Sequence, residues 1–250
     1  MSGVLIVLLP SATKLVKYLH ALGKEYVGIA ELHGGVSPDS LLEATKQFTG
    51  EIYQRPPLRS SVSRRLRTRE VYEFDVLELK DRRFLFKVKT ESGTYIRKLI
   101  HDLGIYLGVG AHMVELRRTS DGPFTEDSSF NLLEVAAAAY RHFECGDSKL
   151  LKELIRPMEE VIRDFPSVYI KDSAVAAVCY GASLAVGGIS KLDVPISKGD
   201  VVAIKSLKGE LVAMGRSLMD SKTMLSSEEG LAVVTERVVM ERDIYPKQWS

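Results

Sequence analysis

The sequence has 250 residues, of which 45% are hydrophobic and 27% are charged, and its formal net charge is +1. This composition excludes intrinsic disorder and is typical of a globular protein with room for one large core or for two domains. The two cysteines, Cys145 and Cys179, lie far apart without a second Cys or His at ligand spacing, which argues against a disulfide framework or a zinc site. Both are expected to be small, buried apolar residues in a reducing interior.

The first apolar run covers residues 4–9, six residues that read VLIVLL, and Pro10 closes it. No cationic segment precedes the run, and it is shorter than the apolar core of a signal peptide, about 7–15 residues. A membrane-spanning helix needs about 20 apolar residues, and no run in the sequence approaches that length. The pattern therefore predicts a strand that is buried on both faces.

The segments that follow alternate between helical and strand patterns. Ser37 and Pro38 mark the N-cap and the first position of one helix, and Gly23 marks the C-terminal end of another. Helices are predicted over residues 13–22, 38–48, 132–140 and 148–163. Strands are predicted over residues 25–32, 71–79, 84–89 and 111–118, the second and third of them as a hairpin.

The sequence changes in texture after Pro166, where repeated glycines separate short β-rich runs. This pattern predicts a small β-barrel of about 75 residues, which is a normal size for a domain. We therefore expect an α+β protein with two domains, residues 1–165 and residues 166–250.

Residues 55–69, RPPLRSSVSRRLRTR, contain six arginines and no acidic residue. Arginine suits planar, bidentate contact with phosphate, whereas a solvated basic face more often mixes Lys with Glu. Two interpretations stay open on charge clustering alone, namely binding to a phosphate backbone and an exposed loop.

The most specific local pattern covers residues 86–124. A strand ends at Lys89, and Thr94 is expected to cap a helix whose apolar positions fall at helical spacing. Arg97 then lies in the first turn, where a cation opposes the helix dipole at a cost of about 0.3–1 kcal/mol. There it would direct positive potential at a carboxylate or a phosphate, and the alternative is a surface arginine paired with a nearby acid.

Several motifs in this region and around it, in this order along the chain, resemble those of the TruB/Cbf5/dyskerin family of RNA pseudouridine synthases, in its archaeal form. Those of the first domain are IYQRPPL (52–58), GTYIRKL (93–99), HDLG (101–104) and GAHMVELRRT (110–119). Those that resemble the RNA-binding PUA domain are VCYGASL (178–184), GDVV (199–202) and GELVAMG (209–215). The likeness covers nearly the whole chain.

The resemblance implies a mixed, largely antiparallel sheet with flanking helices, followed by a PUA barrel. It implies an isomerase that converts uridine to pseudouridine in tRNA (the position 55 type) or, with a guide RNA, in ribosomal RNA. Such an enzyme uses neither a metal nor a cofactor. The expected partners are substrate RNA, a box H/ACA-type guide RNA and small ribonucleoprotein proteins, with no membrane, and the expected location is cytoplasmic.

The resemblance also assigns site residues. Tyr26 matches a tyrosine that stacks on the flipped-out base, Arg97 matches an arginine that pairs with the catalytic aspartate, and Leu116 lies in a motif that forms an apolar wall. An ordinary strand tyrosine and a core leucine are the alternatives, and a solvated strand face is the alternative for Lys87 and Lys89, which would face the same cleft. RNA contacts are expected at Lys14, Arg55, Arg59, Arg64, Arg65, Arg67, Lys87, Lys89, Gly181 and Ala182.

Three departures from the family pattern stand out. Ser63 replaces a usual Lys, and Pro10-Ser11 replaces a turn that contains Gly. The nucleophilic aspartate of a Gly-Thr-Leu-Asp-Pro motif has no counterpart in the printed residues, and we expect it shortly upstream of Met1 in a longer protein. The rival expectation is an inactive RNA-binding or scaffold protein that has lost this aspartate. An RNA methyltransferase is disfavoured because no Gly-rich cofactor loop follows a strand.

Overall fold

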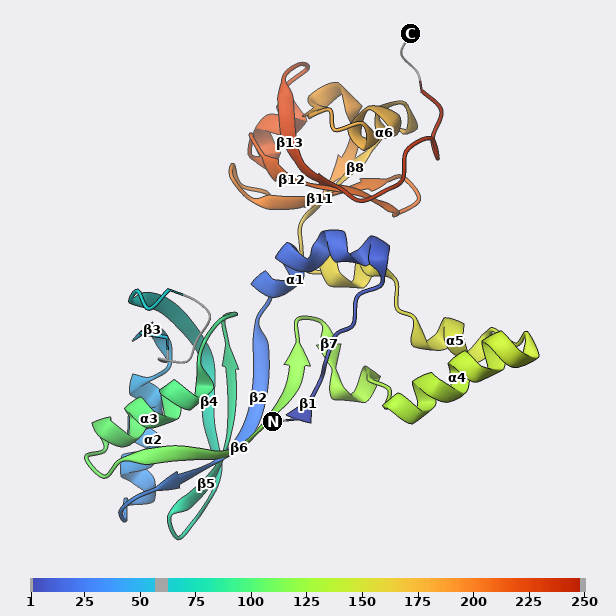
Figure 1. Ribbon diagram of the computed structural model, residues 1–250. Helices are drawn as coiled ribbons and strands as arrows, with labels where there is room; N and C mark the ends of the chain where they lie inside the picture. The colour runs from blue at the N-terminus through green and yellow to red at the C-terminus, as the bar shows by residue number, and fades with distance from the viewer. Residues whose placement is uncertain (1, 57–62, 248–250) are drawn as a thin grey trace. The chain divides into compact units, whose positions relative to one another are not determined.

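The structure, a computed structural model, describes residues 2–56 and 63–247. Their backbone forms two compact units, drawn with their element labels in Figure 1. The first unit takes the residues up to Val7 and His20–Tyr140, and the second takes Leu8–Leu19 and everything from Arg141 onward. An early segment of the chain is therefore part of the unit that is otherwise built from C-terminal residues.

The first unit is built on a seven-stranded sheet in the order β1-β6-β2-β5-β4-β3, with β7 paired to β6. Its neighbouring strands are antiparallel, except that β1 runs parallel to β6. The strands are β1 (Ser2–Gly3), β2 (Lys24–Leu32), β3 (Gly50–Gln54), β4 (Arg67–Lys80), β5 (Arg83–Thr90), β6 (Ala111–Asp121) and β7 (Phe124–Thr125).

Helices α2 (Pro38–Gln47) and α3 (Ile96–Tyr106) lie beside this sheet (Figure 1) and share one apolar core with it. On β2 and β5 every second side chain enters that core, because successive side chains of a strand point to opposite faces. Phe86 of β5 and Leu99 of α3 are both fully buried in the same cluster, which joins the sheet to the helix. The other face of β2 and β5 carries most of their charged residues, namely Glu25, Glu31, Arg83, Lys87 and Lys89.

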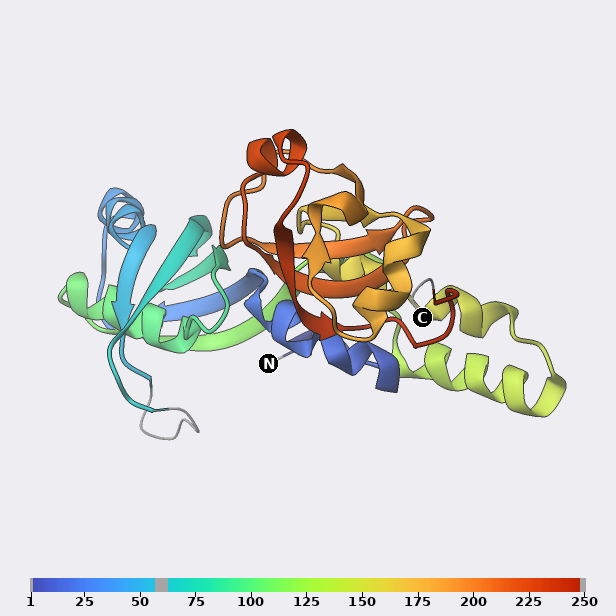
Figure 2. The same ribbon diagram turned by 90° about the horizontal axis from the view of Figure 1, so that it is seen from above.

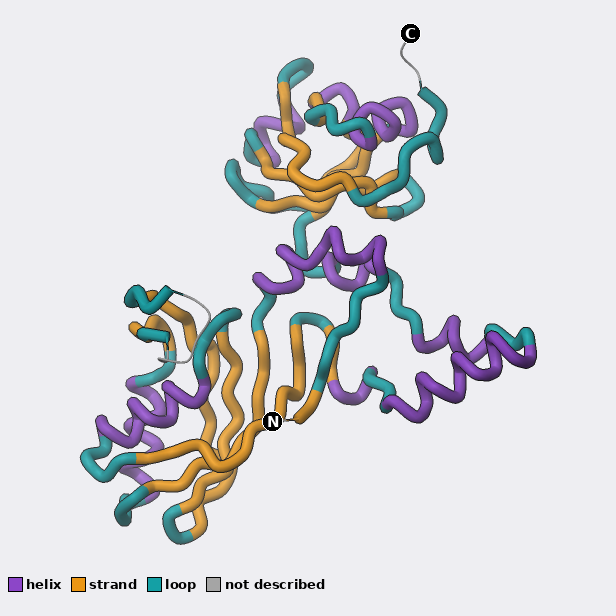
Figure 3. The backbone as a smooth tube through the Cα atoms, in the orientation of Figure 1, coloured by secondary structure: helices purple, strands orange, loops and turns teal. Residues whose placement is uncertain are grey.

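The run at residues 4–9 does not form the strand that its composition predicts. Only Ser2 and Gly3 pair with β6, and Leu5 and Val7 are each 78% exposed. In Figure 3 the chain continues from β1 as a loop. The reason is competition for an edge, because β7 pairs with the last two residues of β6, where a longer β1 would have to bond. An apolar run can form a strand only where a neighbouring edge is open.

Predictions that depend on local chemistry are confirmed. Helix α2 begins at Pro38, and its N-cap Ser37 accepts a hydrogen bond from the backbone N–H of Ser40 at 3.2 Å. Strands β4 and β5 form the expected hairpin, whose turn contains Asp81 at a φ of 56°. Asp is among the few residues other than Gly that accept this left-handed conformation.

Two predicted helices differ in detail. The first starts earlier than expected, as a 3₁₀ segment η1 (Pro10–Leu15) that continues into α1 (Val16–Ala21). The stretch at residues 148–163 is divided into α5 (Lys149–Leu154) and the 3₁₀ segment η3 (Met158–Ile162). Pro157 lies between them, and its ring and missing N–H prevent one continuous helix.

The second unit contains a barrel-like sheet of six strands in the order β10-β8-β11-β12-β13-β9. Its strands, gold to red in Figure 2, are antiparallel neighbours except for the parallel pair β8 and β11. The elements are β8 (Ser167–Ile170), α6 (Asp172–Cys179), β9 (Leu184–Ala185), η4 (Val186–Gly188), β10 (Ile189–Leu192), β11 (Val201–Ser206), β12 (Leu211–Ser217), α7 (Ser221–Ser226) and β13 (Leu231–Val238). The short β-rich runs expected after Pro166 are thus confirmed as one sheet.

The two cysteines have different environments. Cys179 is buried in α6, and this burial raises the pKa of its thiol. Cys145 is exposed at the last position of α4 (Leu132–Cys145), so the expectation of a buried residue is wrong for it. Both thiols are free.

Helix α4 is mostly exposed. Ala138 is the one buried side chain among its fourteen residues, so most of this helix does not pack into a core.

Candidate functional sites

The turn before α3 is held by Gln54 and Gly93. The Gln54 side chain is buried, and its amide accepts a hydrogen bond from the Tyr95 N–H at 2.9 Å and donates one to the Tyr95 carbonyl at 3.2 Å. Gly93 has a φ of +80°, and a Cβ there would lie 3.3 Å from the Arg69 guanidinium. The expected cap at Thr94 is wrong, because the N-cap is Tyr95 and the Thr94 hydroxyl donates backward to the Glu91 carbonyl.

Arg97 lies in the first turn of α3, as the sequence predicts, and its side chain is exposed. Within residues 2–56 and 63–247, the Arg97 guanidinium has neither an ion pair nor a hydrogen bond. The expected alternative, a surface arginine paired with an acid, therefore does not hold for the described residues. A cation in this turn opposes the helix dipole, so Arg97 adds positive potential at an end that already attracts anions.

Tyr26 lies on β2, on the sheet face that α3 covers, and packs against the apolar core. Burial raises the pKa of its hydroxyl above 10.0, the nearby Arg118 guanidinium lowers it, and the Asp121 carboxylate raises it. The net shift is upward, so Tyr26 is protonated at neutral pH. The side chain combines a half-buried aromatic ring with a neutral hydroxyl.

Leu116 lies on β6 and is 5% exposed, within the same core cluster. Its Cα partner on β2 is Gly28, two residues beyond Tyr26, so Leu116 and Tyr26 share one sheet face on adjacent strands. A Cβ at Gly28 would lie 2.6 Å from the Phe86 ring, so a residue with a side chain would not fit here without displacing that ring. The structure thus brings Tyr26, Leu116 and the helix that carries Arg97 to one face of the sheet.

Lys87 and Lys89 lie on the opposite face. They alternate on β5 with the buried Phe86 and Val88, and the Lys87 ammonium lies 3.0 Å from a Glu25 carboxylate oxygen. The hydrogen bond from Lys87 to Glu25 raises the pKa of this lysine. The expectation that either lysine faces the Tyr26 cleft is therefore wrong, because strand alternation turns both away from it. The solvated strand face, the other expected reading, describes them better.

The arginine-rich segment is described only in part. Arg59 lies outside the described residues. Arg55, Arg64 and Arg65 are exposed, and Arg64 donates to the Pro56 carbonyl at 3.3 Å. Arg67 is half-buried at the start of β4 and donates to the Ser63 carbonyl at 3.3 Å.

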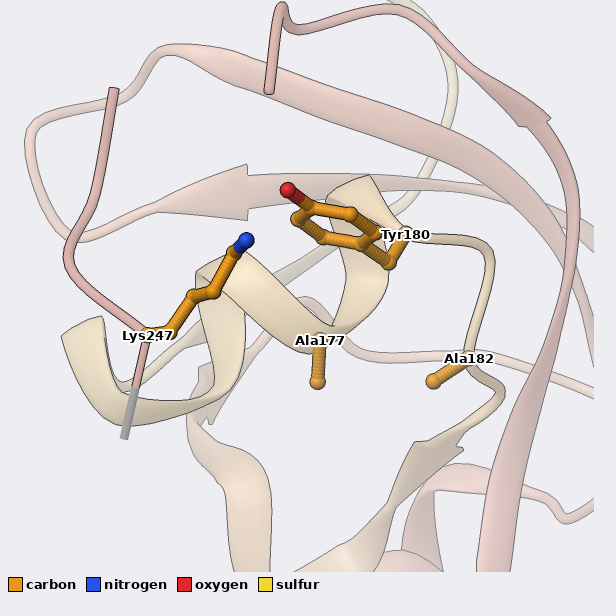
Figure 4. A pocket seen from close by; sticks show the side chains of 4 residues that line it. All are labelled: Ala177, Tyr180, Ala182 and Lys247. Atoms are coloured by element: carbon orange, nitrogen blue, oxygen red, sulfur yellow. The ribbon is translucent and has the colours of Figure 1, made fainter. Parts of the chain in front are cut away.

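The second unit carries another cluster of predicted residues. Lys14 and Gly181, which are far apart in sequence, line one pocket together with Tyr180 and Arg242. Ala182 lines an adjoining pocket with Tyr180, shown in Figure 4. The Lys14 ammonium donates to the Val239 carbonyl at 2.8 Å, which fixes the lysine at the rim.

Tyr180 is flanked by two cations that the sequence does not single out. The Lys247 ammonium lies 4.6 Å from the centre of the Tyr180 ring, and the Arg242 guanidinium lies 4.9 Å from it. The interaction with Tyr180 raises the pKa of Lys247. An aromatic ring next to cations is a common means of holding nucleic-acid bases and phosphates. Both cations lie more than 60 residues after Tyr180 in the sequence, and the tertiary fold brings them to its ring.

No group of three or more His, Cys, Asp or Glu side chains that could hold a metal ion occurs in residues 2–56 and 63–247. No helix in the same ranges is both long enough and apolar enough to cross a membrane.

Comparison with protein families gives three matches. Residues 97–163 match the tRNA pseudouridylate synthase B C-terminal domain, and residues 166–239 match the PUA domain. Residues 5–105 match the C-terminal part of Pus10. The fold and the matched families define an RNA pseudouridine synthase with a C-terminal PUA domain.

Individual relatives are similar over the whole chain. The probable tRNA pseudouridine synthase B of Pyrococcus horikoshii is 53% identical over 99% of this chain and 75% of its own length, and that of Archaeoglobus fulgidus is 47% identical over 100% and 77%. In a crystal structure of a Cbf5-Nop10-Gar1 complex, one chain superimposes with a TM-score of 0.93 at 52% identity, covering 98% of this chain and 75% of that chain. The chain belongs to the archaeal tRNA pseudouridine synthase B family, to which Cbf5 belongs.

Proposed function

We propose that this protein isomerises uridine to pseudouridine in structured RNA, in tRNA or, with a guide RNA, in ribosomal RNA. The observation that carries the proposal is the meeting of Tyr26, Leu116 and the Arg97-bearing turn of α3 on one sheet face. The relatives that are 53% identical to this chain, each a probable tRNA pseudouridine synthase B, support it. One chain of a solved H/ACA RNP bound to a substrate RNA containing 2′-deoxyuridine is 49% identical to this chain.

The reaction is a rearrangement within one nucleotide. The C1′–N1 bond breaks, the uracil turns, and a C5–C1′ bond forms, while C5 loses a proton and N1 gains one. The target base must first leave its stack, which costs a few kcal/mol. The Tyr26 ring would compensate for part of this loss by stacking on the base, and Leu116 would close the apolar side of the pocket.

Arg97 would hold an anion next to the base. Its guanidinium is exposed and has no acidic partner in the described residues, so it is available for a carboxylate or for substrate phosphate. An arginine next to a carboxylate lowers the pKa of that carboxyl group and keeps it ionised. In the family such a carboxylate assists the cleavage of the glycosidic bond, and Arg97 is the residue that we assign to orient it.

RNA would be held at two further places. Arg55, Arg59, Arg64, Arg65 and Arg67 would follow its phosphates, and Lys14, Gly181 and Ala182, with Tyr180, would bind it on the PUA unit. Each phosphate contact to single-stranded RNA contributes about −0.7 to the log–log slope of affinity against salt. The replacement of Arg64 and Arg65 by Gln should therefore weaken binding and flatten this slope.

We further propose partner proteins of the Nop10 and Gar1 kind, since the chain is 52% identical to one chain of a solved Cbf5-Nop10-Gar1 complex. We propose the domain boundary at residues 165/166, supported by the PUA match from residue 166 and by β8 from Ser167. Two free thiols support a reducing, cytoplasmic location.

The test is a tritium-release assay on the protein expressed from its natural gene, with RNA labelled at C5 of uridine. Release from RNA in the presence of guide RNA and partner proteins, or from tRNA alone, is the expected result. Arg97→Lys should abolish most of the release at unchanged RNA affinity, because lysine lacks the planar fork that pairs with a carboxylate. RNA binding without any release under either condition would refute the enzyme and favour the scaffold.

A further inference from the structure

Three charged side chains meet at one end of the sheet, where β2 begins and β6 ends. The Asp121 carboxylate lies 3.0 Å from the Lys24 ammonium and 3.2 Å from the Arg118 guanidinium. The side chains of Asp121 and Lys24 are only 9% and 12% exposed. Charges so far from water are stable only when they are paired, so this cluster is a fixed part of the fold.

Arg118 connects this cluster to two other elements. Its Nε and one terminal nitrogen both donate to the Val4 carbonyl, at 2.8 and 2.6 Å. Its other terminal nitrogen faces Asp121. Arg118 is also the Cα partner of Tyr26 across the β2–β6 pair, and its guanidinium lies close enough to the Tyr26 hydroxyl to lower the pKa of that hydroxyl. One side chain thus links the segment after β1, strand β2 and strand β6.

We propose that Arg118 is a positioning residue, which fixes the ring of Tyr26 and the backbone at Val4 in one geometry. This inference rests on the function proposed for Tyr26. Asp121 fixes the guanidinium in turn, and Lys24 balances the negative charge of Asp121, so that one net positive charge stays next to the Tyr26 hydroxyl. Arg118 would touch no reacting atom and would act through Tyr26.

The geometry requires arginine in particular. A guanidinium presents five N–H donors in a rigid plane, so it can serve a carbonyl, a carboxylate and a hydroxyl at the same time. A lysine ammonium has three donors on a flexible stem and no fixed plane. Arg118→Lys therefore keeps the charge next to Asp121 and loses the alignment of Tyr26.

The neighbouring arginine provides a matched control. Arg117 precedes Arg118 on β6, points to the opposite face and pairs with Glu126. Its side chain is 56% exposed, whereas that of Arg118 is 26% exposed. Arg117→Lys makes the same chemical change in the same strand without touching Tyr26.

The experiment compares Arg118→Lys, Arg118→Met and Arg117→Lys in the protein expressed from its natural gene. For Arg118→Lys we expect kcat for tritium release to fall at least tenfold, with KM and RNA affinity changed less than twofold. Arg117→Lys should keep kcat within twofold of the unaltered protein. Unchanged kcat in Arg118→Lys would overturn the proposal, as would an equal loss in both lysine variants.

A second measurement separates this inference from the proposed function. With ring-labelled tyrosine, and with the Tyr26 signal assigned through Tyr26→Phe, the NMR titration of Tyr26 should move to higher pH in Arg118→Met, because the cation that lowers its pKa is gone. Asp121→Asn should move it to lower pH. If the unaltered protein releases no tritium, the proposed function fails while these shifts still test the contact. An unmoved Tyr26 titration in folded Arg118→Met overturns the inference whatever the activity.

Discussion

The replacement of Gln54 by Met tests whether the start of α3 depends on one buried amide. Met has nearly the same length and fills the same space, so the packing is largely conserved. The change removes both hydrogen bonds to the Tyr95 backbone. Each bond contributes about 0.5–1.5 kcal/mol, which gives a total loss of about 1–3 kcal/mol.

The loss should be measured locally, because a protein with two compact units need not unfold in one step. Hydrogen exchange of the α3 amides across a urea titration reports the opening of this helix. With a urea m-value of about 2 kcal/mol/M, the midpoint for α3 should fall by about 0.5–1.5 M. Tritium release should fall as well, because Arg97 lies in the first turn of the loosened helix.

Gln47→Met is the matched control, because Gln47 is exposed at the end of α2 and its side chain makes no hydrogen bond within the described residues. It should leave the α3 midpoint unchanged. Gln54→Glu adds a second test, since a protonated glutamic acid can copy the amide at low pH and a carboxylate cannot donate to Tyr95 at neutral pH. An α3 midpoint in Gln54→Met equal to that of Gln47→Met would refute the reasoning.

Three further predictions concern stability and reactivity. Ser37→Ala should destabilise the first unit by about 1 kcal/mol in urea unfolding through loss of the N-cap, and an unchanged midpoint would contradict this. The hydrogen bond from Lys17 lowers the pKa of Glu236 below 4.5, so the pair stabilises the second unit above that pH and its contribution disappears as the pH falls through the lowered value. Glu236→Gln should accordingly be the less stable protein at pH 7 and should match the unaltered one in strong acid; a difference independent of pH would argue against the pair. A thiol reagent should label Cys145 rapidly in the native protein and Cys179 only after unfolding, and equal rates would contradict their different burial.

The sequence alone was sufficient to predict those features of the fold that depend on interactions between residues close together in the chain. The cap at Ser37, the hairpin around Asp81 and the alternation of β2 each depend on residues within a few positions of one another. Residues 4–9 were misjudged because a strand needs a free edge, and the occupation of that edge by β7 is a property of the folded sheet. Composition alone gives the hydrophobicity of a run and leaves its neighbours undetermined.

The candidate site likewise contains some features that local patterns predict and others that only the folded chain produces. The assignments of Arg97 and Tyr26 came from motifs, and the position of Lys87 on the opposite face from Tyr26 follows from period-two alternation that the sequence already contains. The cap at Thr94 failed because Gln54, distant in sequence, supplies hydrogen bonds to Tyr95. Arg242 and Lys247 reach Tyr180 only through the tertiary fold, so no local pattern could have named them.

The membership of Leu8–Leu19 in the second unit has a consequence during synthesis. Lys14 and the Val239 carbonyl, which it contacts, are 225 residues apart in the chain. At the usual speed of a ribosome, about 5–20 residues per second, Lys14 emerges roughly 10–45 s before its partner exists. During that interval the segment cannot make the contacts that it has in the folded second unit, so its folding must wait until the C-terminal residues have been synthesised.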